Sequence, residues 1–161
     1  MPVDLFRIDD RLIHGQVVVG WGQPLDLAFI ALVDDTVASS EWEQELYRMG
    51  VPPEISLEFL TVAQAAGAIA SLDARKEHGM VLTATIETMC ELVKRSGAIR
   101  AVNVGGIHHR AGRSARLRYV FLTPEEEQGL RTLAALGATV TAQDVPATNP
   151  VPLDAILKGT G

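Results

Sequence analysis

The chain has 161 residues, 47% of them hydrophobic and 21% charged, a length and composition that suit one compact domain over residues 1–161. Its 14 Lys and Arg against 20 Asp and Glu give a formal charge of −6, which argues against nucleic-acid binding, and no apolar run approaches the roughly 20 residues of a membrane-spanning helix. With a single cysteine, which excludes an intrachain disulfide, and no secretory signal in its first residues, we expect a cytoplasmic protein.

Short apolar segments alternate with helical patterns along the chain. The predicted strands cover residues 3–8, 27–33, 55–60, 80–83, 99–104, 118–122 and 138–142. Alternation of this kind is typical of α/β proteins with a mainly parallel sheet. We therefore expect a single three-layer α/β/α domain, a sheet of six or seven strands, and an active site at the carboxyl ends of the strands.

The segments between the strands carry apolar residues at helical spacing. Helices are predicted at 16–21, at 39–49, around 62–69, 86–93 and 130–136, and at 153–158. Trp42, Leu46 and Met49 share one face of the second helix. Thr123, with Glu126 three residues later, predicts a capping box, and Thr61 predicts a weaker N-cap. Residues 144–152, with three prolines, predict an irregular connection.

The loop after the first predicted strand concentrates reactive side chains. Asp9, Asp10, Arg11 and His14 lie between that strand and a helix, whose first N–H groups favour an anion. A neutral imidazole offers a nucleophilic nitrogen, an arginine can bind phosphate oxygens, and either aspartate could orient the ring. Gly15 lets an incoming group approach the backbone. The alternative is a solvated or capping histidine beside an ordinary surface ion pair.

Two threonines lie at the end of the fourth predicted strand, on the same edge of the expected sheet. The hydroxyl groups of Thr83 and Thr85 could face His14. Alternatively, Thr85 could only cap the helix that follows.

Eleven residues around the histidine form a specific pattern, Arg7-Ile8-Asp9-Asp10-Arg11-Leu12-Ile13-His14-Gly15-Gln16-Val17, followed by Trp21. This pattern resembles the active-site signature of the IIB components of mannose-type sugar phosphotransferase systems. Segments 33–35 and 102–106 and the basic loop with Arg110, Gly112 and Arg113 agree in order. The similarity covers essentially the whole chain, and the parallel α/β sheet of that family agrees with the predicted elements.

The resemblance implies a phosphoryl relay. His14 would attack a phosphohistidine of a IIA protein, and the phosphoryl group would pass to a sugar held and selected by membrane IIC and IID components. His14, Arg11 and Asp9 would then be catalytic, and the phosphoryl group would be bound by Asp10, Gly15, Gln16, Thr83, Thr85 and Arg110. The scheme needs no cofactor or metal. It implies a phosphotransferase recruited to the inner face of the membrane, and it is compatible with a homodimer.

Two other functions use the same loop. One is a regulatory protein whose phosphorylation state is read by a partner without sugar transfer. The other is a small-molecule binding module with no covalent step. Both keep His14 in the same place, so the residues alone do not separate them from the relay.

Other motifs have less specific interpretations. Arginines at positions 110, 113, 116 and 118 form either a solvated loop or a docking site for an acidic partner. His108 and His109 are potential metal ligands, but the side chains of adjacent residues rarely bind the same ion. The position of Asp34 along the chain is similar to that of the acid that binds ribose in dinucleotide-binding folds. The first strand–helix turn, however, lacks the glycine pattern that binds NAD. We expect Trp21 and Cys90 in the core.

Overall fold

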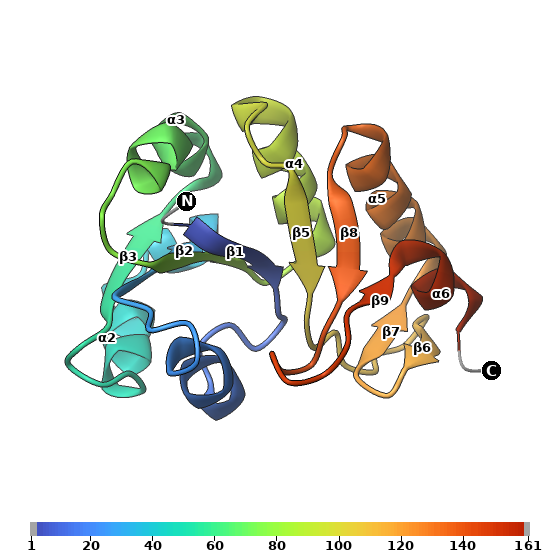
Figure 1. Ribbon diagram of the computed structural model, residues 1–161, viewed down its shortest axis with the longest axis horizontal. Helices are drawn as coiled ribbons and strands as arrows, with labels where there is room; N and C mark the ends of the chain where they lie inside the picture. The colour runs from blue at the N-terminus through green and yellow to red at the C-terminus, as the bar shows by residue number, and fades with distance from the viewer. Residues whose placement is uncertain (1–2, 160–161) are drawn as a thin grey trace.

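A seven-stranded sheet runs through the centre of the molecule (Figure 1). The structure is a computed structural model that describes residues 3–159. The sheet consists of β1 (Val3–Ile8), β2 (Phe29–Val33), β3 (Ser56–Leu60), β4 (Gly79–Thr83), β5 (Ala101–Val104), β8 (Thr139–Ala142) and β9 (Val151–Pro152). Their order is β3-β2-β4-β1-β5-β8-β9, and every pairing is parallel except that of β8 with β9.

Helices cover both faces of this sheet. They are a π-helical segment η1 (Gln16–Gly22) and the helices α1 (Asp35–Ala38), α2 (Glu41–Met49), α3 (Val62–Asp73), α4 (Ile86–Ser96), α5 (Pro124–Ala135) and α6 (Leu153–Lys158). Helices α3, α4 and α5 lie on one face, and η1 and α2 lie on the other, while α6 lies beside β9 (Figure 1). The predicted three-layer α/β/α architecture is confirmed.

Strand β2 shows how one sheet supplies two cores. Its residues alternate: Ala31 packs in the cluster with α3, α4 and α5, whereas Ile30 and Leu32 pack in the cluster with Val17 and Trp21 of η1. Successive side chains of a strand point to opposite faces, and here both faces are covered, so the strand is apolar throughout.

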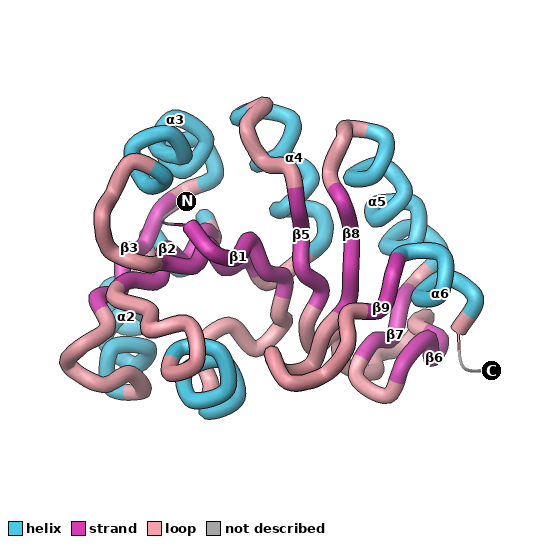
Figure 2. Tube along the Cα trace, viewed as in Figure 1, coloured by secondary structure: helices cyan, strands magenta, loops and turns pink. Residues whose placement is uncertain are grey.

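The central strand β1 brings three loops together at its carboxyl end. The Asp9 N–H donates to the Thr83 carbonyl after β4 at 2.9 Å, and the Asp10 N–H donates to the Gly106 carbonyl after β5 at 2.9 Å. From this point β1 leads to η1 on one face, while β5 leads towards α5 on the other, and the connecting loops gather at this edge (Figure 2). Such a switch point is where open α/β sheets place their sites.

Two sheet predictions are wrong. The segment predicted as a strand at 118–122 lies outside the main sheet, where β6 (Ser114–Leu117) and β7 (Val120–Leu122) form an antiparallel hairpin. The seventh strand is β9, inside the segment predicted to be irregular. Because proline has no N–H to donate, Pro152 is tolerated on this edge strand. The other strands begin and end within two residues of the predicted bounds.

The second helix also differs from the prediction. The helix predicted at 39–49 is α2, which starts after the N-cap Ser40, and it is preceded by a short helix that was not predicted, α1, capped by Asp34. The apolar residues Trp42, Leu46 and Met49 are 72%, 50% and 82% exposed. Helix α2 packs through other positions, because the Gln44 side chain donates to the Val37 and Ala38 carbonyls and Tyr47 joins the core.

The capping box predicted at Thr123 is present, and the N-cap predicted at Thr61 forms a second box. Thr123 accepts from the Glu126 N–H at 3.0 Å, the Glu126 carboxylate accepts from the Thr123 N–H at 2.9 Å, and Thr61 and Gln64 repeat the pattern at α3. Each box satisfies two N–H groups that a helix start leaves free.

We expect Thr123→Ala to destabilise the protein by about 1 kcal/mol, because the Glu126 N–H loses its acceptor. Thr132→Ala is the matched control in the same helix. Its hydroxyl donates only to the Gln128 carbonyl one turn back, so its loss should leave the unfolding free energy nearly unchanged. Urea unfolding of both variants provides the measurement, and equal losses would contradict the assigned role of the box.

Candidate active site

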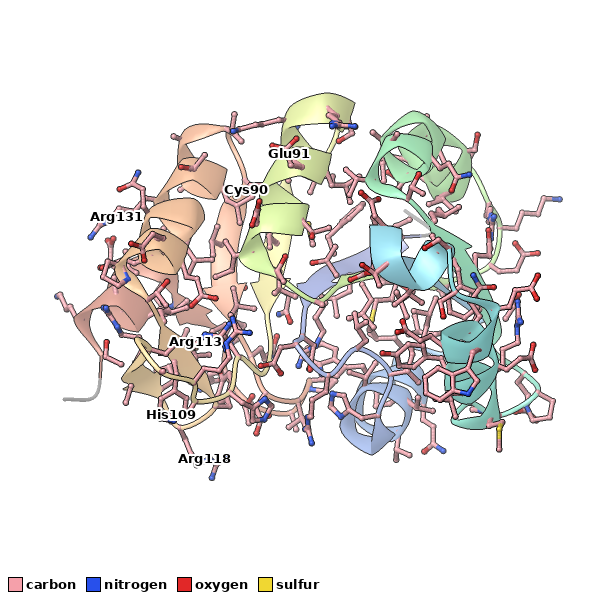
Figure 3. The ribbon with its side chains drawn as sticks, turned by 180° about the vertical axis from the view of Figure 1, so that it is seen from behind. Cys90, Glu91, His109, Arg113, Arg118 and Arg131 are labelled. Carbon is pink, nitrogen blue, oxygen red and sulfur yellow. The ribbon has the colours of Figure 1, made fainter. Side chains whose placement is uncertain are left out.

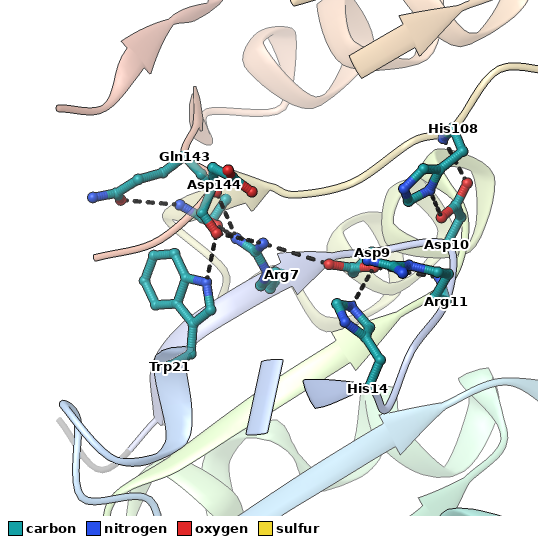
Figure 4. A network of polar contacts seen from close by, with 10 residues as sticks. Arg7, Asp9, Asp10, Arg11, His14, Trp21, His108, Gln143 and Asp144 are labelled. Atoms are coloured by element: carbon teal, nitrogen blue, oxygen red, sulfur yellow. Dashed lines mark hydrogen bonds and ion pairs between the residues drawn. The ribbon is translucent and has the colours of Figure 1, made fainter. Parts of the chain in front are cut away.

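Asp9 holds the imidazole of His14. The His14 Nε2 lies 3.0 Å from the Asp9 Oδ1, and the two side chains are 14% and 2% exposed (Figure 4). An ionised carboxylate can only accept, so Nε2 carries the proton that it donates. The other ring nitrogen, Nδ1, then has a free lone pair. The ring is thus oriented with one nitrogen available to an electrophile.

Asp9 is ionised at neutral pH in spite of its burial. Burial acts to raise the pKa of its carboxyl group. The hydrogen bond and charge of His14, the charge of Arg7 and the N–H of Arg11 act in the opposite direction and outweigh it, so the pKa lies below its ordinary value of 3.8. The Arg11 N–H donates to the Asp9 Oδ1 at 3.3 Å.

Arg7 supports Asp9 from below, a role that the sequence analysis missed. Its guanidinium is 1% exposed and lies 3.5 Å from the Asp9 Oδ2. It also donates to the Asn103 side chain and to the Gln143 and Asp144 carbonyls, the last two at 2.9 and 3.4 Å. Burial lowers the pKa of Arg7, and the charges of Asp9 and Asp144 oppose that shift. Arg7 therefore joins β1, β5 and the loop after β8.

The surroundings of Arg7 explain Trp21, which follows the signature, and Gly105, which lies in the matching segment 102–106. The Arg7 Cζ lies 4.7 Å from the centre of the Trp21 ring, and the Trp21 Nε1 donates to the Asp144 carbonyl at 3.1 Å. A Cβ at Gly105 would come within 2.3 Å of the Arg7 Nη2, so only glycine fits there. Trp21 is buried, as predicted. A charged residue between the apolar residues Phe6 and Ile8 of β1 was the signal that could have identified Arg7.

The backbone between Asp9 and His14 makes a tight turn through Leu12. The Leu12 N–H donates to the Asp9 carbonyl at 3.0 Å, and Leu12 has φ 57°, a left-handed conformation that costs a non-glycine residue about 1–2 kcal/mol. Its side chain is 4% exposed and packs in the core beneath η1. Burial of this side chain opposes the backbone cost and keeps the turn in place.

The residues next to His14 face the solvent. Arg11 and Gly15 are exposed, and a Cβ on Gly15 would meet nothing within 4 Å, so the space above the loop is open. Gln16 is the first residue of η1, but its side chain lies outside the described part of the structure. Their roles in binding a phosphoryl group stay predictions.

Asp10 turns away from His14 towards the loop after β5. It accepts from the His108 N–H and from the His108 Nδ1, both at 2.7 Å, and lies 3.7 Å from the Arg113 Nη1. The structure therefore joins the two loops through Asp10. Its predicted contact with the phosphoryl group stays a prediction.

Of the remaining predicted residues, Thr85 and Arg110 line a hollow next to this pair, and Thr83 does not. The hollow has a volume of about 420 Å³ and is lined by Asp10, Ala84, Thr85, His108, His109, Arg110 and Arg113. Thr85 caps α4 by accepting from the Thr88 N–H, as its alternative interpretation predicted. Thr83 is fully buried and donates to the Thr85 carbonyl at 3.3 Å. Arg110 is exposed at the rim.

Two of the four arginines of the cluster, Arg113 and Arg116, are held within the fold by ion pairs and hydrogen bonds. Arg113 is 5% exposed and binds the Glu126 carboxylate with two hydrogen bonds, at 2.9 and 2.7 Å. Arg116 lies near Glu127 and donates to the Leu157 carbonyl. Arg118 is 85% exposed and contacts Asp144.

Comparison with known proteins identifies the family. The family model "PTS system sorbose subfamily IIB component" matches residues 3–161. The sorbose-specific EIIB component of Klebsiella pneumoniae is 29% identical over 150 residues, which are 93% of this chain and 91% of that protein. The N-acetylgalactosamine-specific phosphotransferase enzyme IIB component 1 of Escherichia coli K12 is 31% identical over 145 residues, 88% of this chain and 90% of that protein.

Solved structures agree with this assignment. The crystal structure of the IIBSor domain of the sorbose permease from Klebsiella pneumoniae superimposes with a TM-score of 0.86 at 28% identity, covering 100% of this chain and 99% of that one. No helix among residues 3–159 has the length and apolar character needed to cross a bilayer. The chain therefore belongs to the sorbose-subfamily IIB components of the mannose-type sugar phosphotransferase systems and is a phosphotransferase.

Proposed function

We propose that this chain, acting as one IIB unit over residues 1–161, carries a phosphoryl group on His14 Nδ1. The hydrogen bond between the His14 Nε2 and Asp9 carries the proposal, because it fixes the ring proton on one nitrogen and leaves the other free at an open loop. The IIB family to which the chain belongs supports the phosphoryl chemistry.

The first step is a transfer between two histidines. The His14 Nδ1 lone pair attacks the phosphorus of a phosphohistidine on a IIA donor, and the donor's P–N bond breaks. The His14 ring gains positive charge as the new P–N bond forms, and the nearby Asp9 carboxylate stabilises that charge. Arg11, exposed beside the ring, neutralises the phosphoryl oxygens.

The second step reverses the first at the same nitrogen. A sugar hydroxyl attacks the phosphorus, the hydroxyl proton leaves to solvent or a base of the acceptor site, and Nδ1 departs with its electron pair. Asp9 and Arg7 need not move in either step, so the site is organised before the donor arrives. Alignment and charge stabilisation are the main requirements of phosphoryl transfer.

The family supports the choice of partners. IIB components work with IIA donors and membrane IIC and IID components, and one relative, the mannose-specific EIIAB component of Escherichia coli K12, joins A and B parts in one protein. We infer that this chain acts in the cytoplasm and is recruited to the inner face of the membrane, where those components hold the sugar.

Phosphorylation of His14 is the direct test. After incubation with phosphoenolpyruvate, the general phosphotransferase proteins and a mannose-type IIA protein, we expect an acid-labile phosphoryl group on the peptide that contains His14, attached at Nδ1. Peptide mass spectrometry at neutral pH gives the position, and ¹⁵N NMR gives the nitrogen. His78→Ala should behave like the native chain. An unlabelled His14 beside fully phosphorylated IIA would reject the proposal.

Asp9→Asn tests the charge that Asp9 supplies. The neutral amide has nearly the same shape but cannot offset the positive charge on the ring, so we expect His14 phosphorylation to slow on the order of 100-fold. Asp4→Asn is the matched control, because Asp4 contacts His78 in the same way. Rates from quenched-flow labelling decide the point: similar rates for the two variants would remove Asp9 from the catalytic role.

Arg7→Met tests the support beneath Asp9 through pH dependence. Without the guanidinium, burial still raises the pKa of Asp9 but one of the opposing charges is gone, so the carboxyl group should protonate at a higher pH. The ratio of variant to native phosphorylation rates should then fall at the acid end of about pH 4 to 7. A ratio that stays constant across this range, in a variant with native circular dichroism, would contradict the role.

A further inference from the structure

The molecule contains a second histidine that is oriented by an aspartate at the same edge of the sheet. Asp10 accepts from the His108 Nδ1 and from the His108 backbone N–H, each at 2.7 Å (Figure 4). The His108 side chain is 48% exposed, against 14% for His14. Adjacent acids, Asp9 and Asp10, thus each hold one imidazole by one ring nitrogen.

His108 is held more firmly than an ordinary surface histidine. Besides the two bonds to Asp10, its carbonyl accepts from the Arg113 Nη1 at 2.7 Å. Arg113 is itself fixed by two hydrogen bonds to Glu126 on α5. The ring also lies close to Gly106, where a Cβ would come within 2.9 Å of the His108 Cε1. The loop therefore presents the ring in one orientation.

The surroundings of His108 suit an anion. The ring borders the hollow of about 420 Å³ that Thr85, Arg110 and Arg113 also line. The exposed Arg110 can donate to phosphate oxygens from the rim, while Arg113 donates to Glu126 and to the His108 carbonyl and adds positive charge beside the Asp10 carboxylate. Figure 3 shows Arg113 and His109 on the same edge of the molecule, well apart from Cys90 and Glu91 on α4.

Two other histidines provide comparisons within the chain. His78 contacts Asp4 through Nδ1 at 2.9 Å, but it precedes β4 and so lies at the amino end of the strands, without the hollow. His109 follows His108 directly, its ring stands edge-on to Phe121 at 5.6 Å between centres, and no carboxylate among the described residues holds it. His78 therefore serves as the comparison with a carboxylate partner but outside the hollow, and His109 as the comparison that lines the hollow without such a partner.

We propose that His108 is a second phosphoryl-accepting residue, which takes the group on Nε2 from donors with a P–N bond, the class that includes phosphohistidine and phosphoramidate. Its neutral ring carries a proton on Nδ1, donated to Asp10, and a lone pair on Nε2. Nε2 attacks the phosphorus, the donor's P–N bond breaks, and its nitrogen leaves with the electron pair, as ammonia in the case of zwitterionic phosphoramidate. Asp10 stabilises the positive charge that the ring acquires.

The two sites differ in a measurable way. His14 offers Nδ1 because Asp9 holds Nε2, whereas His108 offers Nε2 because Asp10 holds Nδ1. The two phosphohistidines are therefore different isomers. Position and isomer together identify which carboxylate organised the reacting ring.

The test uses the full-length His14→Ala protein with phosphoramidate as the probe. We expect His108 to be phosphorylated on Nε2 faster than His109 and His78, on the order of tenfold, the factor that one well-placed hydrogen bond to a developing charge supplies. Peptide mass spectrometry at neutral pH follows each site with time, and ¹⁵N NMR identifies the nitrogen. A His108 rate no greater than that of His109, or reaction at Nδ1, would overturn the inference.

Asp10→Asn gives the second measurement. It should lower the His108 rate to that of His109 and leave His78 unchanged, whereas Asp4→Asn should affect His78 alone. An Asp10→Asn protein in which His108 still reacts at the original rate would reject the role of the pair. The unchanged His78 rate and a native melting curve show that the variant is folded.

This result does not depend on the proposed function, because phosphoramidate needs no partner protein. If His108 reacts with phosphoramidate but His14 is not phosphorylated by phospho-IIA, this inference is supported and the relay is rejected. The converse result would keep the relay and reject the second site.

Discussion

The buried contact between Arg7 and Asp9 is the constraint on which the site depends. A carboxylate that is 2% exposed would ordinarily favour its neutral form, and a neutral Asp9 would hold the His14 proton on Nε2 less strongly and would not offset positive charge on the ring. Arg7 opposes this effect from inside the sheet, and it is held there by Asn103, by the loop after β8 and by the ring of Trp21. The orientation of the His14 ring thus depends on a charge placed beneath it.

The position of β1 in the middle of the sheet makes this arrangement attainable. Its neighbours β4 and β5 supply carbonyl groups to Asp9 and Asp10, so the first loop is joined to both flanking loops before any side chain takes part. The left-handed Leu12 then reverses the chain and brings His14 back over Asp9. The cost of that conformation is opposed by burial of the Leu12 side chain, which ties the geometry of the site to the core beneath η1.

Successive residues at the end of a strand point to opposite sides, and Asp9 and Asp10 show the consequence. Asp9 turns to His14 and the buried Arg7, whereas Asp10 turns to His108 and the loop stabilised by Arg113 and Glu126. The same edge therefore has two histidines that differ in which ring nitrogen the aspartate leaves available, Nδ1 in His14 and Nε2 in His108. His108 borders the open hollow. The proposed relay would bring phosphoryl donors to this edge, where the second ring also lies.

The sequence by itself determined the alternation of strands and helices, the capping box at Thr123, the N-cap at Thr61, and the cluster of polar side chains around His14, because these depend on local periodicity and on residues close along the chain. Only the tertiary structure decided the partners of those residues. Periodicity does not tell whether an apolar face is covered, so Trp42 and Met49 were expected to pack and are exposed. Hydrogen bonding between distant segments made β9 an edge strand and excluded β7 from the main sheet. It also placed His108 on Asp10, 98 positions away, and Arg7 on Asn103, 96 positions away, contacts that depend on which strands become neighbours and that no local pattern contains.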